Sequence, residues 1–415
     1  MNYQAKAQFY GWWIVLSGTL IFMVSNGIGF YSHGVLLDPI REQYGWTKGT
    51  VSLAVTLYFL TAGVMGLVIG RAVDKYGAKP MLVIGSIVMG LALLLLDRIS
   101  LRWQFYAVYI LMAVGWCGIS LMPVNTLIAN WFIRKRGQAM SITMTGLSVG
   151  GILLVPFSTF LIARWGLSVA LPVLGLLLWI IIIPLAALVI KQRPADIGQF
   201  PDGIPFDTEP ENGSSVKLSY ASQMREWTRL EAMSTMAFWA IVIAFFLAMT
   251  GQVAYLVHQI SFLGRTLGRA GAATAVSVTA SASIVGRLLL GSFIDRLDKR
   301  GVIIVLFFIQ ATAVLALAFS EHIVVLYLCT FAFGLTMGSI LMMQSLIIGE
   351  CFGMVSFAMV SGVVGFFVSA GAAFGPSMAG FIYDFSQSYR ISFTIFAVMS
   401  LLAAGVIYFA KTPSK

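Results

Sequence analysis

The sequence predicts an all-α membrane protein with twelve transmembrane helices in two six-helix halves related by pseudo-symmetry. Three observations support this fold class. Of the 415 residues, 59% are hydrophobic and only 10% are charged, whereas soluble globular proteins carry about 25% charged residues. Apolar runs long enough to cross a bilayer as helices recur along the whole chain. Landmarks of the first half also return in the second half at a nearly constant offset.

The apolar runs give the expected helices in order. They lie near residues 12–32, 50–70, 80–97, 103–128, 137–163, 168–190, 237–260, 270–294, 301–319, 323–347, 356–383 and 391–410. The first run opens with the aromatics of Tyr10-Gly-Trp-Trp, which suit the membrane interface. Because no small-residue cleavage site followed by a soluble domain appears, we expect this run to be a retained helix and not a signal peptide.

The two halves are expected to be copies of each other. Three residues at the end of the second run return 221 positions later, since Gly70, Asp74 and Lys75 correspond to Gly291, Asp295 and Arg296. Pro156 corresponds to Pro376 at an offset of 220. Transporters are often built from such parallel repeats. We therefore expect a six-helix bundle over residues 1–190, a polar cytoplasmic linker over 191–236 and a second bundle over 237–415.

The basic residues indicate the orientation. The net charge of +10 could suggest a nucleic-acid partner, but of the 26 Lys and Arg residues, 17 fall on one side of the predicted helices and eight on the other. The positive-inside rule places the richer side, with both termini, in the cytoplasm. The sequence therefore predicts a multi-pass protein of a cell membrane, such as a bacterial inner membrane, with the lipid bilayer and not nucleic acid as its surroundings.

No enzyme and no cofactor are expected. Cys117, Cys329 and Cys351 lie in or beside apolar runs without the paired spacing of a disulfide framework or a zinc site. The stretch Gly146-Leu-Ser-Val-Gly150 matches a nucleophile elbow in form, but it lies inside an apolar run, whereas the elbow needs a strand-to-helix turn and a later Asp and His. Its glycines are better explained by close helix packing.

Arg287 is the strongest candidate for a substrate-binding residue. It is the one charge in about two dozen apolar or small residues before Asp295, and such a charge costs roughly 2.5 to 3.5 kcal/mol at a membrane-helix centre. Ser283 lies one turn back on the same face, among small side chains that leave room for a ligand. The alternative is that Arg287, about six residues from the helix end, only reaches out to the cytoplasmic surface.

Other polar and bulky residues could line the same passage. His33 and His258 could carry a proton, or they could be interfacial or structural. Met and Phe residues of the tenth and eleventh runs could form substrate walls, although such residues more often pack helices. The remaining candidate substrate-binding residues are Tyr255, Asn125, Met342 and Phe366.

A cytoplasmic gate is predicted from charges at equivalent helix ends. Asp74 and Asp295 occupy corresponding positions of the two halves. Asp74 can pair with cations such as Arg134 or Arg136, which otherwise hold the orientation of the chain. Such pairs would form in only one conformational state.

The chain resembles the major facilitator superfamily, and within it the monocarboxylate transporter and oxalate/formate antiporter branch. The resemblance spans nearly the whole chain and rests on motifs that occur together. They are YGWW, GVLLDPIREQYGW, GRAVDKYGAKP, NWFIRKRGQAM, RPADIGQFPDG, AFWAI, Arg287 in the eighth helix and GPSMAGFIYDFSQSY. The resemblance implies the major facilitator fold, a twelve-helix transporter of small carboxylates, with Arg287 as the counter-charge of the anion.

The sequence also departs from that branch. Animal members carry an Asp one turn before the arginine, where this chain has Ser283, and a Lys in the first helix that corresponds here to Tyr31. Oxalate exchangers carry a Lys in the eleventh helix, and residues 356–383 contain no Lys or Arg. The usual proton-coupling pair of the family is therefore incomplete.

These observations predict a secondary transporter that works by alternating access as a monomer. Its partners would be a small monocarboxylate anion, similar to lactate or pyruvate, and a proton. A single cation inside the helices matches one negative charge, which favours a monocarboxylate over oxalate. One rival is an exporter or exchanger of another cargo with the same fold, such as an oxalate/formate antiporter or a multidrug exporter. A membrane-embedded sensor or enzyme would need a soluble domain or a catalytic constellation, and the sequence offers neither.

Overall fold

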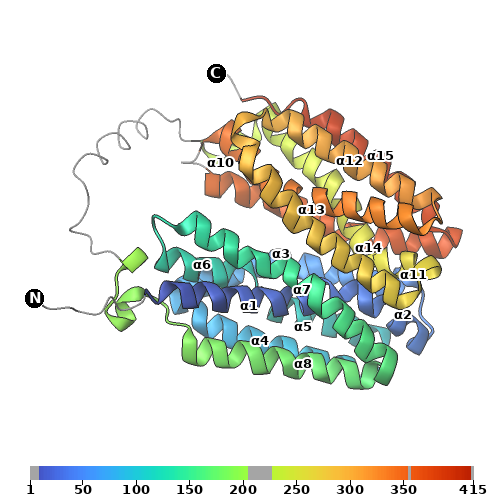
Figure 1. The fold of residues 1–415 in the computed structure, drawn as a ribbon, viewed down its shortest axis with the longest axis horizontal. Coiled ribbons are helices and arrows are strands. Elements are labelled where there is room, and N and C mark those ends of the chain that lie inside the picture. Colours follow the sequence, from blue (N-terminus) through green and yellow to red (C-terminus); the bar gives the residue numbers. More distant parts are fainter. Residues whose placement is uncertain (1–8, 204–226, 354–356, 413–415) are drawn as a thin grey trace, which may run out of the picture. The chain divides into compact units, whose positions relative to one another are not determined.

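The computed structural model describes residues 9–203, 227–353 and 357–412, and every regular element of this described part is a helix (Figure 1). Within it, 11 helical stretches are long and apolar enough to span a bilayer. The number of crossings is twelve, because one of these stretches bends back on itself. The prediction of an all-α membrane protein with twelve transmembrane helices is confirmed.

The bent stretch is α11 (Met236–Phe293), which has 58 residues. A straight helix of that length would measure about 87 Å, nearly three times the roughly 30 Å of bilayer hydrocarbon. The helix is broken at Gly268, where φ is 70° and ψ is 169°. Beyond the bend the two arms run back along each other, since Gln259 Nε2 donates a 2.8 Å hydrogen bond to Thr279 Oγ1. The two arms are the seventh and eighth predicted spans.

The first six crossings use eight helices. They are α1 (Gly11–Gly29), α2 (Ser32–Tyr44), α3 (Lys48–Tyr76), α4 (Ala78–Leu96), α5 (Arg102–Gly118), α6 (Leu121–Trp131), α7 (Arg136–Trp165) and α8 (Leu167–Pro184). Short breaks divide the first crossing into α1 and α2 and the fourth into α5 and α6. The predicted runs near 12–32 and 103–128 are therefore each longer than expected and interrupted.

The second six crossings repeat this order. After the short α10 (Arg229–Met233) and the two arms of α11 come η5 (Ile294–Arg296), α12 (Lys299–Phe319), α13 (Ile323–Phe352), α14 (Phe357–Ser386) and α15 (Tyr389–Ile407). The helices α7 and α14 have 30 residues each, and each contains a proline, Pro156 or Pro376. Corresponding helices thus share both length and their internal landmark.

Packing divides the chain into two compact units. Unit 1 takes described residues within Met1–Phe30, Val64–Leu154 and Trp165–Glu211, and unit 2 takes those within Tyr31–Gly63, Val155–Arg164 and Asn212–Lys415. These packing units cut through α3 and α7, so they do not follow the sequence partition at 190 and 236. That partition describes the repeat and stays a prediction.

Unit 1 packs α4 against α5 and α8, which run side by side in Figure 1. Glycine allows the close approach, because a Cβ added at Gly85 would lie 2.7 Å from the carbonyl oxygen of Gly115. Residues 185–203 pack on the same unit through the η1 (Leu185–Val189), η2 (Pro194–Ile197) and η3 (Pro201–Gly203) turns. Trp131 Nε1 donates a 2.9 Å hydrogen bond to the carbonyl of Lys191. Of the predicted linker 191–236, residues 204–226 lie outside the described residues.

Unit 2 packs α12 against α13 and α15, and α11 against α13, α14 and α15. It also contains α2 and the first part of α3, because α2 lies directly on α11. A Cβ added at Gly34 would lie 3.1 Å from the carbonyl oxygens of Leu256 and Val257, so glycine permits this contact. The turns that follow α2, the bend at Gly268 and the turn before α15 come together at one end of unit 2, which we call the distal end.

Candidate functional site

Arg287 lies on the second arm of α11, inside the membrane-spanning stretch, with a half-buried side chain. It interacts electrostatically with Tyr31, which is buried at the junction of α1 and α2. Among the carboxylates whose side chains are described, none lies within ion-pair distance of Arg287.

Ser283 lies one turn before Arg287 and is fully buried. Its hydroxyl donates a 2.9 Å hydrogen bond to the carbonyl of Ala280 in its own helix. Gly338 of α13 packs against the backbone of Ser283, a contact that any larger residue would block. The small residues before Arg287 therefore serve helix packing on at least this side of α11.

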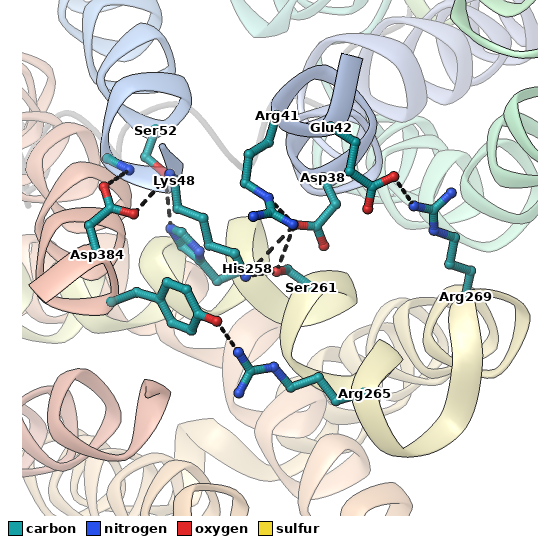
Figure 2. Close-up of polar contacts among 12 residues, drawn as sticks. Asp38, Arg41, Glu42, Lys48, Ser52, His258, Ser261, Arg265, Arg269 and Asp384 are labelled. Carbon is teal, nitrogen blue, oxygen red and sulfur yellow. Dashed lines mark hydrogen bonds and ion pairs between the residues drawn. The ribbon is translucent and has the colours of Figure 1, made fainter. Parts of the chain in front are cut away.

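A second polar site lies at the distal end, and its centre is Lys48 (Figure 2). Lys48 begins α3, yet it is only 4% exposed. In the sequence it lies between two apolar runs, where a cation is expected in a loop, so its burial was not predicted. Its ammonium donates hydrogen bonds to Ser261 Oγ and, at 2.8 Å, to the Tyr389 hydroxyl. Asp38 Oδ1 of α2 lies 3.7 Å from the same nitrogen. Lysine is almost never buried without such partners.

Asp384 of α14 fixes the start of α3 in this position. Its two carboxylate oxygens accept hydrogen bonds from the backbone N–H groups of Lys48, at 3.0 Å, and of Gly49, at 2.7 Å (Figure 2). A carboxylate is favoured there because the first N–H groups of a helix have no partner within it and carry partial positive charge. Asp384 thus caps a helix more than 330 residues away in the sequence.

His258 extends the distal polar site toward the interior of unit 2. Its Nδ1 lies 3.0 Å from the Tyr389 hydroxyl, and its Nε2 lies 3.0 Å from the Pro376 carbonyl and 3.2 Å from Ser52 Oγ. A carbonyl can only accept, so we assign the proton of the neutral ring to Nε2. Tyr389 also contacts Lys48 and Ser261. A continuous hydrogen-bonded chain therefore joins His258 to the buried ammonium.

The same chain reaches a carboxylate. Ser261 Oγ lies 3.1 Å from Asp38 Oδ1 and donates to it. The side chain of Asp38 is 21% exposed, so it is the most solvent-exposed of these four hydrogen-bonded residues. From Asp38 through Ser261 and Tyr389 to His258, every step is a contact between groups that can pass a proton.

The other histidine candidate is held by aromatic rings. His33 of α2 is buried, with its ring centroid 4.4 Å from that of Tyr58 and 5.6 Å from that of Phe59. Both rings belong to α3. The structure therefore places His33 and His258 in separate surroundings within unit 2.

The remaining substrate candidates are dispersed. Tyr255 is fully buried, and its hydroxyl lies 3.2 Å from Thr330 Oγ1 while its ring packs on Phe333. Met342 is half-buried and Phe366 is 56% exposed. Asn125 belongs to α6 of unit 1, and its buried Oδ1 has no hydrogen-bond partner among the described residues.

Three of the predicted gate residues belong to unit 1 and one belongs to unit 2. Asp74, Arg134 and Arg136 are all exposed, and the described part of the chain contains no ion pair between them. Instead, Asp202 accepts hydrogen bonds from the backbone N–H groups of residues 133–135 just before α7. Asp295 lies in η5, and its side chain is outside the described residues.

Twelve bilayer-spanning crossings, with a half-buried guanidinium and a buried ammonium within unit 2, are features of a polytopic membrane transporter. The family of that transporter follows from comparison with known proteins. The chain belongs to the Major Facilitator Superfamily, whose family model matches residues 19–350 and 259–415.

Three curated relatives show the breadth of the similarity. The chain is 25% identical to the MFS-type transporter pynF of Aspergillus niger, over 95% of this chain and 87% of that protein. It is 24% identical to monocarboxylate transporter 13 of Bos taurus, over 96% of this chain and 88% of the relative. It is also 24% identical to the oxalate:formate antiporter of Oxalobacter formigenes, over 74% and 68%. The resemblance to this superfamily and branch is confirmed.

A solved structure supports the fold independently. A point mutant of the nucleoside transporter NupG matches with a TM-score of 0.76 over 96% of this chain and all of that chain, at 13% identity. At this identity the similarity supports the fold alone. The expected major facilitator fold with two six-helix halves is confirmed.

Proposed function

We propose that the protein carries small monocarboxylate anions, similar to lactate or pyruvate, across a membrane together with a proton by alternating access. The observation that carries this proposal is Arg287, a half-buried guanidinium without a carboxylate partner among the described side chains. A guanidinium stays charged and presents planar donors that match a carboxylate with two hydrogen bonds. The names of relatives that carry monocarboxylates or exchange oxalate and formate support an organic anion as cargo.

The charge of the cargo follows from the number of unpaired cations. Lys48 is a second buried cation, but Asp38 lies 3.7 Å from it and offsets its charge. Arg287 therefore remains the one cation well inside the predicted runs that needs a counter-charge. Leaving a charge unmatched in a low-dielectric site costs several kcal/mol. One cation and one carboxylate balance, whereas oxalate would keep an unmatched negative charge.

The proton is assigned to the histidines and their hydrogen-bonded neighbours. No acid stands one turn before Arg287, where Ser283 takes its place, so another group must bind the proton. Histidine is the side chain whose ordinary pKa, near 6.5, lies in the working range. The contacts of His258 through Tyr389 and Ser261 to Asp38 give it a path to the partly exposed carboxylate.

The distal end is proposed to be the extracellular gate, which is closed in this structure. Both termini are proposed to face the cytoplasm. The excess of basic residues on the side of the termini supports this orientation. Opening the gate would break the contacts of Lys48 with Ser261 and of Asp384 with the start of α3. At the opposite ends of the halves, Asp74 and Asp295 would form contacts with cations such as Arg134 or Arg136 in the alternate state.

Transport by purified protein tests the proposal. Proteoliposomes containing the protein are given labelled lactate, pyruvate, acetate or oxalate, with and without an inward proton gradient. We expect accumulation of the monocarboxylates that rises with the gradient, and weak competition by oxalate at pH 7. Absence of monocarboxylate uptake, or oxalate transport equal to lactate transport, would contradict the proposal.

A second candidate function is export or exchange of another cargo. The relative named Fujikurins efflux protein, 27% identical over 39% of this chain, gives this alternative its support. A cargo without a negative charge would not need a guanidinium. Transport that survives the replacement of Arg287 by alanine would favour this candidate over the first.

A further inference from the structure

A separate cavity opens at the distal end, with a volume of about 250 Å³. This is several times the roughly 30 Å³ that one water molecule takes up in the liquid, so it can hold a small organic molecule. All of its lining residues belong to unit 2. They come from α2, the start of α3, the end of α7, both sides of the bend in α11, and α14.

The lining of the cavity contains more positive than negative groups. Four cations, Arg41, Lys48, Arg265 and Arg269, line it together with two carboxylates, Asp38 and Glu42. The nearby Asp384 does not line the cavity, and its oxygens accept from the backbone of α3. The lining therefore carries two positive charges more than negative ones.

The ion pairs identify the cation of the lining that has no described carboxylate within ion-pair distance. Arg269 pairs with Glu42 at 2.5 Å, while Arg41 and Lys48 share Asp38 at 3.5 and 3.7 Å. Arg265 donates to the hydroxyl of Tyr383 and stacks against the same ring, with its guanidinium carbon 5.0 Å from the ring centroid (Figure 2). No described carboxylate lies within ion-pair distance of Arg265. Its guanidinium is thus oriented but not neutralised.

Apolar side chains also line the cavity. Val35, Ile162 and Ile260 contribute to its wall. A lining that combines an excess of cations with apolar side chains fits a molecule with one carboxylate and a short hydrocarbon part. We propose that this cavity, hereafter the distal vestibule, binds a small monocarboxylate through Arg265, as a site of its own in addition to the Arg287 site.

The vestibule and the Arg287 site are far apart along the chain. Arg265 precedes the bend at Gly268, and Arg287 follows it by 19 residues, or about 28 Å at the helical rise.

The proposal of a vestibule site rests on the proposed function only for the identity of the natural ligand. A cleft with an excess of one sign of charge raises the local concentration of counter-ions and their association rate. The vestibule would thus capture the anion before the gate opens.

Binding is tested with trifluoroacetate, a monocarboxylate that fluorine NMR detects even when it binds weakly. The Arg287→Ala protein in zwitterionic phosphatidylcholine nanodiscs removes the other anion site and supplies no anionic headgroup. We expect saturable line broadening by trifluoroacetate, and none by the uncharged trifluoroethanol. Adding Arg265→Gln should weaken the binding at least tenfold, whereas Arg390→Gln, which removes an equal charge from an arginine outside the cavity, should not.

Two results would overturn the inference. Equal binding by the Arg265→Gln and Arg390→Gln proteins would mean that the vestibule is not the site, and equal broadening by trifluoroethanol would mean that charge is not recognised. Nanodiscs with anionic lipid provide a further arm, because loss of trifluoroacetate binding there would assign the cavity to lipid headgroups. The titration needs no transport, so it can succeed even if the proposed cargo is wrong.

Transport kinetics supply an independent readout in the otherwise unchanged protein. Arg265→Gln should lower the initial rate of lactate uptake at low substrate and low salt about tenfold, and Arg390→Gln should leave it unchanged. The difference should vanish near 1 M salt, where the Debye length falls to about 3 Å. A defect of Arg265→Gln that persists at high salt would contradict capture by charge and indicate a structural role.

Discussion

At the scale of single residues, substitutions of Arg287 distinguish two roles for it. Its guanidinium either binds the carboxylate of the substrate or only reaches out to the membrane surface. Arg287→Ala should abolish monocarboxylate transport, while the protein still inserts and folds. Arg287→Lys should rescue it only in part, because an ammonium offers a point charge and not a planar pair of donors. Uptake into proteoliposomes measures both variants, and size-exclusion profiles check the fold. Transport by the alanine variant at the normal rate would support snorkelling.

The histidines can be separated by comparing accumulation with exchange. His258→Gln keeps an N–H that can donate to the Pro376 carbonyl, but it cannot take up a proton. Alone or combined with His33→Gln, it should lose gradient-driven accumulation of lactate and retain lactate/lactate exchange, which needs no net proton movement. His322→Gln changes an exposed histidine at the start of α13 and serves as the control. Full accumulation by the double variant would show that neither residue carries the proton.

Residues of the candidate sites could be predicted from the sequence only where a charged residue lies within an apolar run. Arg287 stands out because it interrupts an apolar run. Lys48 and Asp384 do not, because each lies at the end of a run, where charged residues are common. Their partners lie 213 to 341 positions away in the sequence, and no local pattern encodes such a contact. The distal site therefore required the tertiary structure.

At the scale of elements, the contact between α3 and α14 holds the distal end together. A Cβ added at Gly380 would lie 2.8 Å from Ser52 Oγ and 2.9 Å from the Lys48 carbonyl oxygen, so the helices would have to separate. Gly380→Ala should shift the population toward an open distal end. Spin labels on the exposed positions Gln43 and Thr266 should report a longer distance.

The matched control for this variant is Gly405→Ala, where an added Cβ meets no atom within 4 Å. Its distance distribution should equal that of the unsubstituted protein. If the two alanine variants gave the same distribution, the close approach at Gly380 would have no part in keeping the distal end joined.

Helix positions were largely predictable, whereas their breaks were not. Bilayer thickness dictates runs of about 20 apolar residues, so each predicted run has a helical counterpart in the described residues. The interruption of the first crossing before α2 and the helical residues that extend the seventh and eighth runs up to the bend at Gly268 depend on packing. Gly34, for example, lets α2 lie on α11, and its sequence neighbourhood alone gives no sign of that contact.

At the scale of the whole molecule, the proposed orientation can be tested with single cysteines. In a variant whose three native cysteines are replaced by alanine, Leu230→Cys should react with a membrane-impermeant maleimide only after the membrane is opened. Glu321→Cys should react in intact cells. Both positions are more than four-fifths exposed, so access by the reagent is not limited by burial. The reverse pattern would invert the proposed topology.

Because Asp384 caps α3, hydrogen–deuterium exchange can measure the opening of the distal end. The N–H groups of Lys48 and Gly49 are bonded to a carboxylate of another helix, and not to their own helix. They can exchange with solvent only when α14 moves away. Their protection factors therefore convert directly into the free energy of opening at this end. A cargo that favours the closed form would slow these two amides by the factor of its preference, which gives a thermodynamic scale for ligands without any transport assay.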